Sequence, residues 1–193
     1  MTRSNRIILN GKEFSLFKDY SLKHRDDLRA LPMDDKLRYL EERARLVFLD
    51  ALDEWLSLLN SKCLSSFHEL NMVTLVCCAI EGLGHYLTGD DNAGDAFRRF
   101  IGEFMPAFSP VQNELWNSFR NGLAHGFCIK HGGIEKNLCK PFKSDGEKGI
   151  KLDFDIFVSD FKKAFDNFFK KLETEKEIFE ENFTARFKEV LID

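Results

Sequence analysis

The chain has 193 residues, of which 44% are hydrophobic and 31% charged, and it contains 20 phenylalanines and four prolines. This length and composition suit one mostly helical domain spanning residues 1–193 rather than a disordered chain. The formal net charge of −4 excludes a broad, nonspecific grip on nucleic acid but is compatible with a local basic surface.

The first elements predicted along the chain are a short strand and a long helix. Residues 6–9 form the candidate strand, and the Asn-Gly pair that follows it forms a turn. A proline followed by Asp34 or Asp35 then marks a helix start, and apolar residues recur at helical spacing as far as Leu58. This spacing predicts a helix of about seven turns.

The second and third helices are predicted from capping and stop signals. Ser66 and Glu69 have the spacing of a capping box, and they open the most apolar helix of the chain, which ends at Gly89. A helix with so little polar surface is usually surrounded by other elements. The stretch "DDNAGDAFRRFIGEFMPAF" predicts a shorter third helix that ends near Pro106.

A fourth helix carries a polar stripe. It is predicted to start at a cap signature formed by Ser109, Pro110 and Gln112, and to run through "LWNSFRNGLAHGF", residues 115–127. Four polar residues recur at every fourth position of this helix, and they are Asn113, Asn117, Asn121 and His125. Residues four apart share one face of a helix, so these side chains form one stripe.

After His125 the pattern changes from helical to alternating. The stretch "GFCIKHGGIEKNL" predicts a β-hairpin that turns at Gly132 and Gly133 and pairs Phe127 with Leu138. A further short strand is predicted in "KSDGEKGIKLDFD". Asp155 then caps a final helical region rich in phenylalanine. The expected fold class is therefore mostly α, a helical bundle with a β-hairpin inserted after the fourth helix.

Charge is distributed unevenly along the chain. Residues 120–151 contain seven basic and three acidic side chains, whereas residues 173–193 contain three basic and seven acidic ones. The polar stripe thus lies at the start of a basic segment, which is a candidate surface for a phosphate backbone.

The cysteines and the apolar runs bear on where the protein resides. The five cysteines follow no regular spacing, and they stand at positions 63, 77, 78, 128 and 139. An odd number of scattered cysteines argues against a disulfide-stapled secreted domain, so we expect free thiols. The N-terminal residues lack a secretory signal, and no run of about 18 uncharged apolar residues suggests a membrane span. We therefore expect a cytoplasmic protein without a membrane association.

Arg120 and Gly122 stand out within the fourth helix. On spacing alone the favoured interpretation is structural: Asn121 and His125 cap the helix end, and Arg120 pairs with an acid or stacks on Trp116. Gly122 inside a helix costs about 1 kcal/mol relative to alanine, which predicts the close approach of a neighbouring backbone. Arg120 and His125 are five residues apart, so they meet only through the reach of the arginine and distortion of the helix end.

The stretch "RNGLAH", Arg120 to His125, resembles the signature of the HEPN superfamily, in which an arginine followed by a polar residue precedes a histidine a few positions later. With the order of the helices, the resemblance covers roughly residues 34–170. It implies a helical bundle that dimerises with two such motifs facing each other. It also implies a metal-independent endoribonuclease without a cofactor, of a toxin or defence system, with an antitoxin or a nucleotidyltransferase as a further partner.

The residues of this motif suit RNA cleavage. RNA carries its own nucleophile in the 2′-hydroxyl group, so the reaction needs a group that moves a proton near neutrality and a cation for the charge on phosphorus. His125 would move the proton, Arg120 would hold the phosphate, and Asn121 would orient the imidazole. The resemblance further implies a 2′,3′-cyclic phosphate product and an acidic residue on the second helix, which we place at Glu81. The alternative for Glu81 is a pair with His85, four residues on.

Other chemistries are weaker interpretations of the sequence. A zinc site would draw on the residues His125, Cys128, His131 and Cys139. In the predicted hairpin Cys128 and His131 point to opposite faces, and the chain contains no CxxC motif, so we expect no metal. The alternatives to a ribonuclease are a noncatalytic RNA- or nucleotide-binding module that regulates a partner, and a purely structural dimer.

Overall fold

The computed structural model describes residues 6–16, 22–60, 67–89, 91–126 and 128–190, and most of these lie in helices. The α-helices are α1 (Leu22–Arg29), α2 (Met33–Ala44), α3 (Asp50–Asn60), α4 (Phe67–Thr88), α5 (Ala93–Phe104), α6 (Gln112–Glu114), α7 (Asn121–Gly126), α8 (Phe154–Thr174) and α9 (Lys176–Val190). The π-helical segments Arg45–Leu49 and Leu115–Arg120 join α2 to α3 and α6 to α7. The strands are β1 (Arg6–Leu9), β2 (Lys12–Ser15), β3 (Gly132–Glu135), β4 (Phe142–Ser144) and β5 (Ile150–Asp153).

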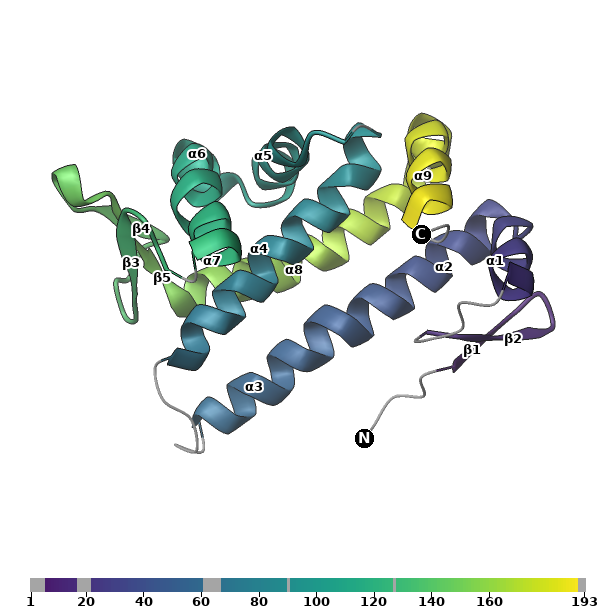
Figure 1. Cartoon of the computed structure of the whole chain (residues 1–193), viewed down its shortest axis with the longest axis horizontal. Coiled ribbons are helices and arrows are strands. Elements are labelled where there is room, and N and C mark those ends of the chain that lie inside the picture. Colours follow the sequence, from purple (N-terminus) through teal and green to yellow (C-terminus); the bar gives the residue numbers. More distant parts are fainter. Residues whose placement is uncertain (1–5, 17–21, 61–66, 90, 127, 191–193) are drawn as a thin grey trace.

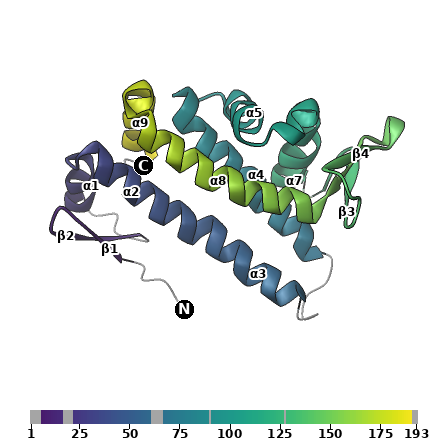
Figure 2. The same ribbon diagram turned by 180° about the vertical axis from the view of Figure 1, so that it is seen from behind.

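The helices pack around α4 and α8. In Figure 1, α2 and α3 form one long rod along one side, α4 crosses above it, and α8 lies behind α4. Figure 2, seen from behind, shows α8 in front, with α5 and α7 on the side opposite the rod. The small sheets lie at opposite ends: β1 and β2 beside α1 and α2, and β3 to β5 beside α7.

Phenylalanine side chains of α8 fill the space between the helices. Phe157, Phe161, Phe165 and Phe168 are fully buried. Their rings meet rings of other elements, with centroids 5.3 Å apart for Phe108 and Phe157 and 5.7 Å apart for Phe100 and Phe168. Each buried phenylalanine stabilises the fold by about 1.5–3 kcal/mol, so this stripe accounts for a large part of the core.

Several sequence predictions are confirmed. The strand at residues 6–9 is β1, and its turn leads into the antiparallel partner β2. The long first helix is found as α2, the π-helical segment and α3 in continuous succession from Met33 to Asn60. The second helix ends at Thr88 and is followed by Gly89 with a φ of 69°, the left-handed conformation that glycine adopts most easily. The capping residue Ser66 lies outside the described residues.

The predicted caps at Asp155 and Ser109 are wrong. Asp153, two residues before Asp155, caps α8, because its carboxylate accepts hydrogen bonds from the backbone N–H groups of Ile156 and Leu138. Ser109 lies inside a 3-10 turn spanning Pro106–Val111, and α6 begins without a side-chain cap. Asp153 is the cap because its carboxylate binds both the first turn of α8 and the loop at Leu138.

The predicted hairpin is also corrected. Strand β3 pairs in parallel with β5, and β4 pairs antiparallel with β5, so the sheet order is β3-β5-β4. Gly132 and Gly133 lie inside β3 and pair with Ile150 and Lys151 rather than forming a turn. A Cβ atom at Gly132 would stand 2.2 Å from the carbonyl oxygen of Ile150, so the glycine allows the close approach of β5.

Among the described helices, α4 is long and apolar enough over His68–Thr88 to cross a membrane, and 61% of its most apolar window is buried inside the fold. Its close packing against α5 explains part of that burial. A Cβ atom at Gly84 would stand 2.1 Å from the carbonyl oxygen of Ala96, so α4 and α5 approach to backbone contact there. The apolar surface of α4 is thus used by neighbouring helices.

Candidate functional site

The motif residues lie where a π-helical segment passes into α7. In the segment Leu115–Arg120 the hydrogen bonds are one residue longer than in an α-helix, and the backbone N–H of Asn121 donates to the carbonyl of Trp116. Arg120 is the last residue of this segment, and His125 lies in the last turn of α7. Such single-turn π-helices occur frequently at functional sites.

Three side chains converge on the guanidinium group of Arg120. Its Nε donates to the carboxylate of Glu81 on α4, and its Nη1 donates to Asn121 Oδ1 at 3.0 Å. The same Nη1 stands 3.3 Å from His125 Nε2. The structure therefore brings together all four predicted site residues, which come from two helices.

An aromatic ring supports the guanidinium from one face. The central carbon of the Arg120 guanidinium lies 4.9 Å from the centroid of the Trp116 ring, and Trp116 in turn lies against the buried ring of Phe97 on α5. Both contacts of the structural interpretation, an acid and Trp116, are thus present. With Glu81, Asn121 and Trp116 around it, Arg120 is held in one orientation before any ligand arrives.

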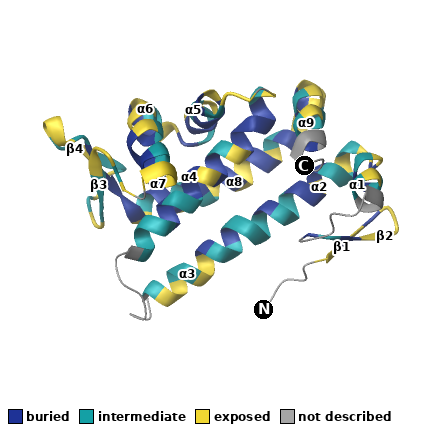
Figure 3. Cartoon of the chain, in the orientation of Figure 1, coloured by how far each residue is buried: buried dark blue, intermediate teal, exposed yellow. Residues whose placement is uncertain are grey.

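The site is open on the side of His125. The side chains of Glu81 and Arg120 are 15% and 17% exposed, whereas His125 and its neighbours Ala124 and Gly126 are exposed. Figure 3 shows this exposed surface along α7. Within the described residues Arg120 Nη2 makes no hydrogen bond, so its two N–H groups remain for an anion.

The contact between Arg120 and His125 fixes the tautomer of the imidazole. A guanidinium can only donate hydrogen bonds, so in this contact Nε2 of His125 is the acceptor. The ring proton then lies on Nδ1. Nε2 is the atom that would accept a proton in general base catalysis, and to do so it must exchange its contact with Arg120 Nη1 for the substrate hydroxyl.

The predicted contact of Asn121 with the imidazole is replaced by its bond to Arg120. Among the described residues neither Asn113 nor Asn117, both exposed, contacts the cluster. The stripe therefore divides: its last two members belong to the site, and the first two face solvent. Among the four residues of the stripe, Asn121 and His125 are the ones that the guanidinium of Arg120 reaches.

Gly122 has the role predicted for it. A Cβ atom there would stand 2.4 Å from the carbonyl oxygen of Cys128, and the backbone N–H of Cys128 donates to the carbonyl of Gly122 at 3.3 Å. Lys130 N–H donates to the carbonyl of Ser118 at 3.2 Å. The chain after α7 thus folds back onto the helix as far as Lys130, the first lysine of the basic segment.

The charges of the site affect the pKa values of two neighbouring cysteines on α4, Cys77 and Cys78. Burial raises the pKa of the Cys78 thiol, the cation of Arg120 lowers it, and the carboxylate of Glu81 raises it. Burial also raises the pKa of Cys77. Both thiols are free and keep their protons at neutral pH, so neither has the character of a nucleophile. Cys63 lies outside the described residues.

Lysines of the β3–β5–β4 region form the exposed part of the basic segment. Lys136 pairs with Glu69 and Lys151 pairs with Glu135. The remaining lysines of the region are exposed and make no ion pair within the described residues, and they are Lys130, Lys140, Lys143 and Lys148. We call these four the lysine surface.

Within the described part of the chain, no group of three or more His, Cys, Asp or Glu side chains is placed to hold a metal ion. Comparison of the chain with family models, with curated proteins and with solved structures found no significant match. The geometry of the cluster and the resemblance of its motif are therefore the basis for inferring a function.

Proposed function

We propose that the protein is a HEPN-like endoribonuclease that acts as a homodimer without a metal ion. The observation that carries the proposal is the convergence of Glu81, Asn121 and His125 on one guanidinium, beside an exposed imidazole. A mere helix cap would not require an acid from α4, 39 residues away in sequence. In the proposed setting the protein is cytoplasmic and serves as a toxin or defence factor, restrained by an antitoxin or a nucleotidyltransferase.

The proposed reaction begins at the 2′-hydroxyl group of the RNA. Its oxygen attacks phosphorus while His125 Nε2 takes the proton, and the bond from phosphorus to the 5′-oxygen breaks. The products are a 2′,3′-cyclic phosphate and a 5′-hydroxyl end. Arg120 Nη2 donates to a nonbridging oxygen and stabilises the charge that develops there. Glu81 and Asn121 act as positioning residues, because they hold the guanidinium rather than the substrate.

The leaving 5′-oxygen needs a proton, and one motif offers one histidine. In a dimer with two motifs facing each other, the histidine of the second copy, protonated on both ring nitrogens, supplies that proton, which is the reason to propose a homodimer. The exposure of His125, Ala124 and Gly126 leaves this end of α7 accessible to a second copy.

The lysine surface supports RNA as the ligand. Its four exposed ammonium groups, which form no ion pair within the described residues, would bind backbone phosphates of the RNA without reading sequence. The same surface favours the second candidate function, a noncatalytic RNA- or nucleotide-binding module, since it would hold a phosphate backbone whether or not His125 reacts.

Cleavage of mixed RNA in EDTA separates these functions. We expect the wild-type protein to produce cyclic phosphate ends, and His125→Ala and Arg120→Ala to lose about 10²–10⁴-fold in rate. Asn113→Ala, on the same stripe but outside the cluster, is the matched control and should cleave like the wild type. Equal cleavage by all four proteins would end the proposal, and binding without cleavage would leave the module. A protein that stays monomeric at high concentration would remove the dimeric site.

Salt dependence tests the lysine surface. Replacing the four lysines by glutamine should reduce the slope of log K against log salt for single-stranded RNA by about 3, because each phosphate contact contributes about 0.7. Lys163→Gln with Lys170→Gln, two exposed positions on α8, is the control and should leave the slope unchanged. An unchanged slope in the fourfold variant would place the RNA elsewhere on the protein.

A further inference from the structure

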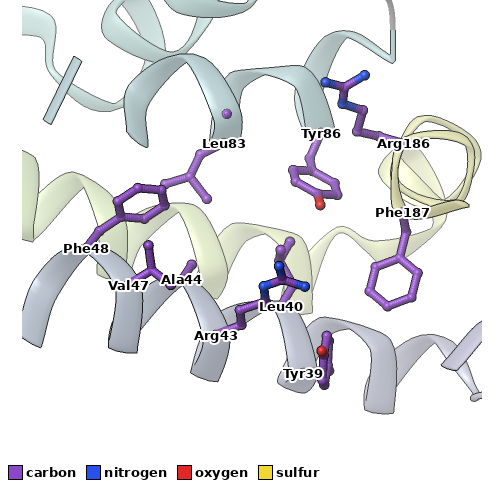
Figure 4. A pocket seen from close by; sticks show the side chains of 11 residues that line it. Tyr39, Leu40, Arg43, Ala44, Val47, Phe48, Leu83, Tyr86, Arg186 and Phe187 are labelled. Carbon is purple, nitrogen blue, oxygen red and sulfur yellow. The ribbon is translucent and has the colours of Figure 1, made fainter. Parts of the chain in front are cut away.

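A cavity of about 250 Å³ lies between the rod of α2 and α3, helix α4 and helix α9 (Figure 4). Arg43 and Tyr39 come from α2, Tyr86 from α4, and Arg186 from α9. Gly82 also lines the cavity and directly follows Glu81, so the cavity lies beside the cluster of the candidate site but on another face of α4.

The hydroxyl group of Tyr86 has no partner in this cavity. Tyr86 is only 5% exposed, and among the described residues its hydroxyl makes no hydrogen bond. Figure 4 shows the hydroxyl pointing into the cavity. Burial raises the pKa of Tyr86 to about 12, so the group remains a donor at neutral pH. The hydroxyl therefore faces the open space of the cavity, where a ligand can reach it.

Arg43 brings a positive charge to the same cavity without a carboxylate to neutralise it. Within the described residues it forms no ion pair, and its hydrogen-bond partner is the hydroxyl of Tyr39, which donates to the carbonyl of Ser15 at 3.0 Å. The other arginine of the cavity differs, because Arg186 Nη1 lies 3.3 Å from the carboxylate of Asp91. Arg43 and Tyr86 thus offer N–H and O–H donors to one anion.

The rest of the wall is apolar. Ala44, Val47 and Phe48 line it from the rod, and Leu83 lines it from α4. In Figure 4 the ring of Phe48 and the side chain of Leu83 close the end opposite Phe187. A ligand in this space therefore has an apolar body and one small anionic end.

We propose that this cavity binds a small amphipathic carboxylate, with its anion on Arg43 and Tyr86 and its alkyl or aromatic body against Val47, Phe48 and Leu83. The cavity holds the volume of about eight water molecules, which suits a chain of about eight carbons. One guanidinium and one hydroxyl satisfy a singly charged planar anion, whereas a phosphate dianion would require more donors. The proposal is independent of the ribonuclease activity.

Titration calorimetry of the full chain with octanoate tests the site. We expect saturable binding that tightens about fourfold for each CH₂ group from hexanoate to octanoate, because each buried CH₂ contributes a nearly constant transfer term. Octan-1-ol, with the same tail and no charge, should bind at least about tenfold more weakly, as hydrogen bonds to charged groups are the stronger ones.

Three variants place the ligand. Arg43→Gln and Tyr86→Phe should each weaken octanoate at least about tenfold. Gly82→Leu should abolish binding, because a Cβ atom at Gly82 meets nothing within 4 Å and the added side chain enters the cavity without displacing the backbone. Arg38→Gln, an exposed position on α2, is the control and should bind like the wild type.

Octanoate that does not bind the wild type, equal binding of octanol and octanoate, or unchanged binding by the Gly82→Leu variant would each overturn the proposal. Circular dichroism of Tyr86→Phe and Gly82→Leu confirms that a loss of binding is not a loss of fold.

Discussion

The ion pair between Arg120 and Glu81 predicts a strong coupling between two substitutions. Both side chains are largely removed from solvent, at 17% and 15% exposure. Breaking a fully buried pair from one side costs about 3–5 kcal/mol, because the remaining charge is left without a partner. Glutamine keeps one polar end, and the pair is not fully buried. We therefore expect Arg120→Gln and Glu81→Gln each to lower the free energy of unfolding by about 2 kcal/mol.

The double variant carries the test. It leaves no unpaired charge, so it should lose about 2 kcal/mol rather than the roughly 4 kcal/mol of additive effects, a coupling of about 2 kcal/mol. For a domain of this size each single variant should melt about 4–8 °C below the wild type. Urea unfolding of the wild type, both single variants and the double variant measures the cycle.

An exposed pair provides the matched control. Lys163 and Asp160 on α8 are 3.1 Å apart, but their side chains are 70% and 27% exposed. The same cycle there should give no more than about 0.5 kcal/mol. If the coupling of Arg120 and Glu81 is as small as that of this control, the two charges do not hold each other, and the positioning role of Glu81 fails.

Two further predictions concern stability. In urea unfolding, Gly122→Ala should destabilise the fold by about 1 kcal/mol or more, since its Cβ atom would stand 2.4 Å from the carbonyl oxygen of Cys128. Gly82→Ala has open space around its Cβ atom and should stabilise α4 by about 0.5–1 kcal/mol. Equal effects of the two substitutions would contradict this packing. Burial raises the pKa of Tyr86 from 10.0 to about 12, so the unfolded chain loses this proton first. The free energy of unfolding should therefore fall by about 2 kcal/mol as the pH rises from 10 to 12. Tyr86→Phe should flatten that fall, and an identical pH profile would refute the assignment.

The helices were predictable because each buries an apolar face at a regular spacing. Leu37, Leu40 and Ala44 of the first predicted helix are buried on one side of α2, and the phenylalanines of α8 follow the same rule. Helix α1 gave no such signal, since its sequence "LKHRDDLR" is mostly charged and, among its described side chains Arg25–Arg29, only Leu28 lies in the core. The π-helical segments were not predicted, because an extra residue in one turn leaves the apolar spacing nearly unchanged.

The sheet was mispredicted because its pairing is nonlocal. The alternation of residues 127–138 and two adjacent glycines favoured a local hairpin. In the structure β5 is the central strand: Ile150 and Leu152 are buried, and residues 132–135 pair with it in parallel. Burial of β5 between two strands satisfies more backbone groups than an isolated two-stranded hairpin, which is only marginally stable.

The sequence predicted which residues belong to the site but not which of them contact one another. Helical spacing placed Asn121 and His125 on one stripe, but it gives no sign that Glu81 meets Arg120, since that contact joins two helices. Only the packing of α4 against the fourth helix brings them together. Likewise, the free hydroxyl of Tyr86 becomes visible only once the walls of its cavity are in place.

The polar cluster joins a largely buried carboxylate on α4 to the exposed end of α7. The side chain of Glu81 is only 15% exposed, so a carboxylate there costs stability unless a cation meets it. Arg120 meets that need with Nε alone, which leaves Nη1 for Asn121 and His125 and Nη2 for an anion. A lysine has one nitrogen and could not serve all of these positions at once. The guanidinium of Arg120 is bound by Glu81 at Nε and remains accessible at Nη2, which a packing role alone does not require. This arrangement places a fixed positive charge beside Nε2 of His125.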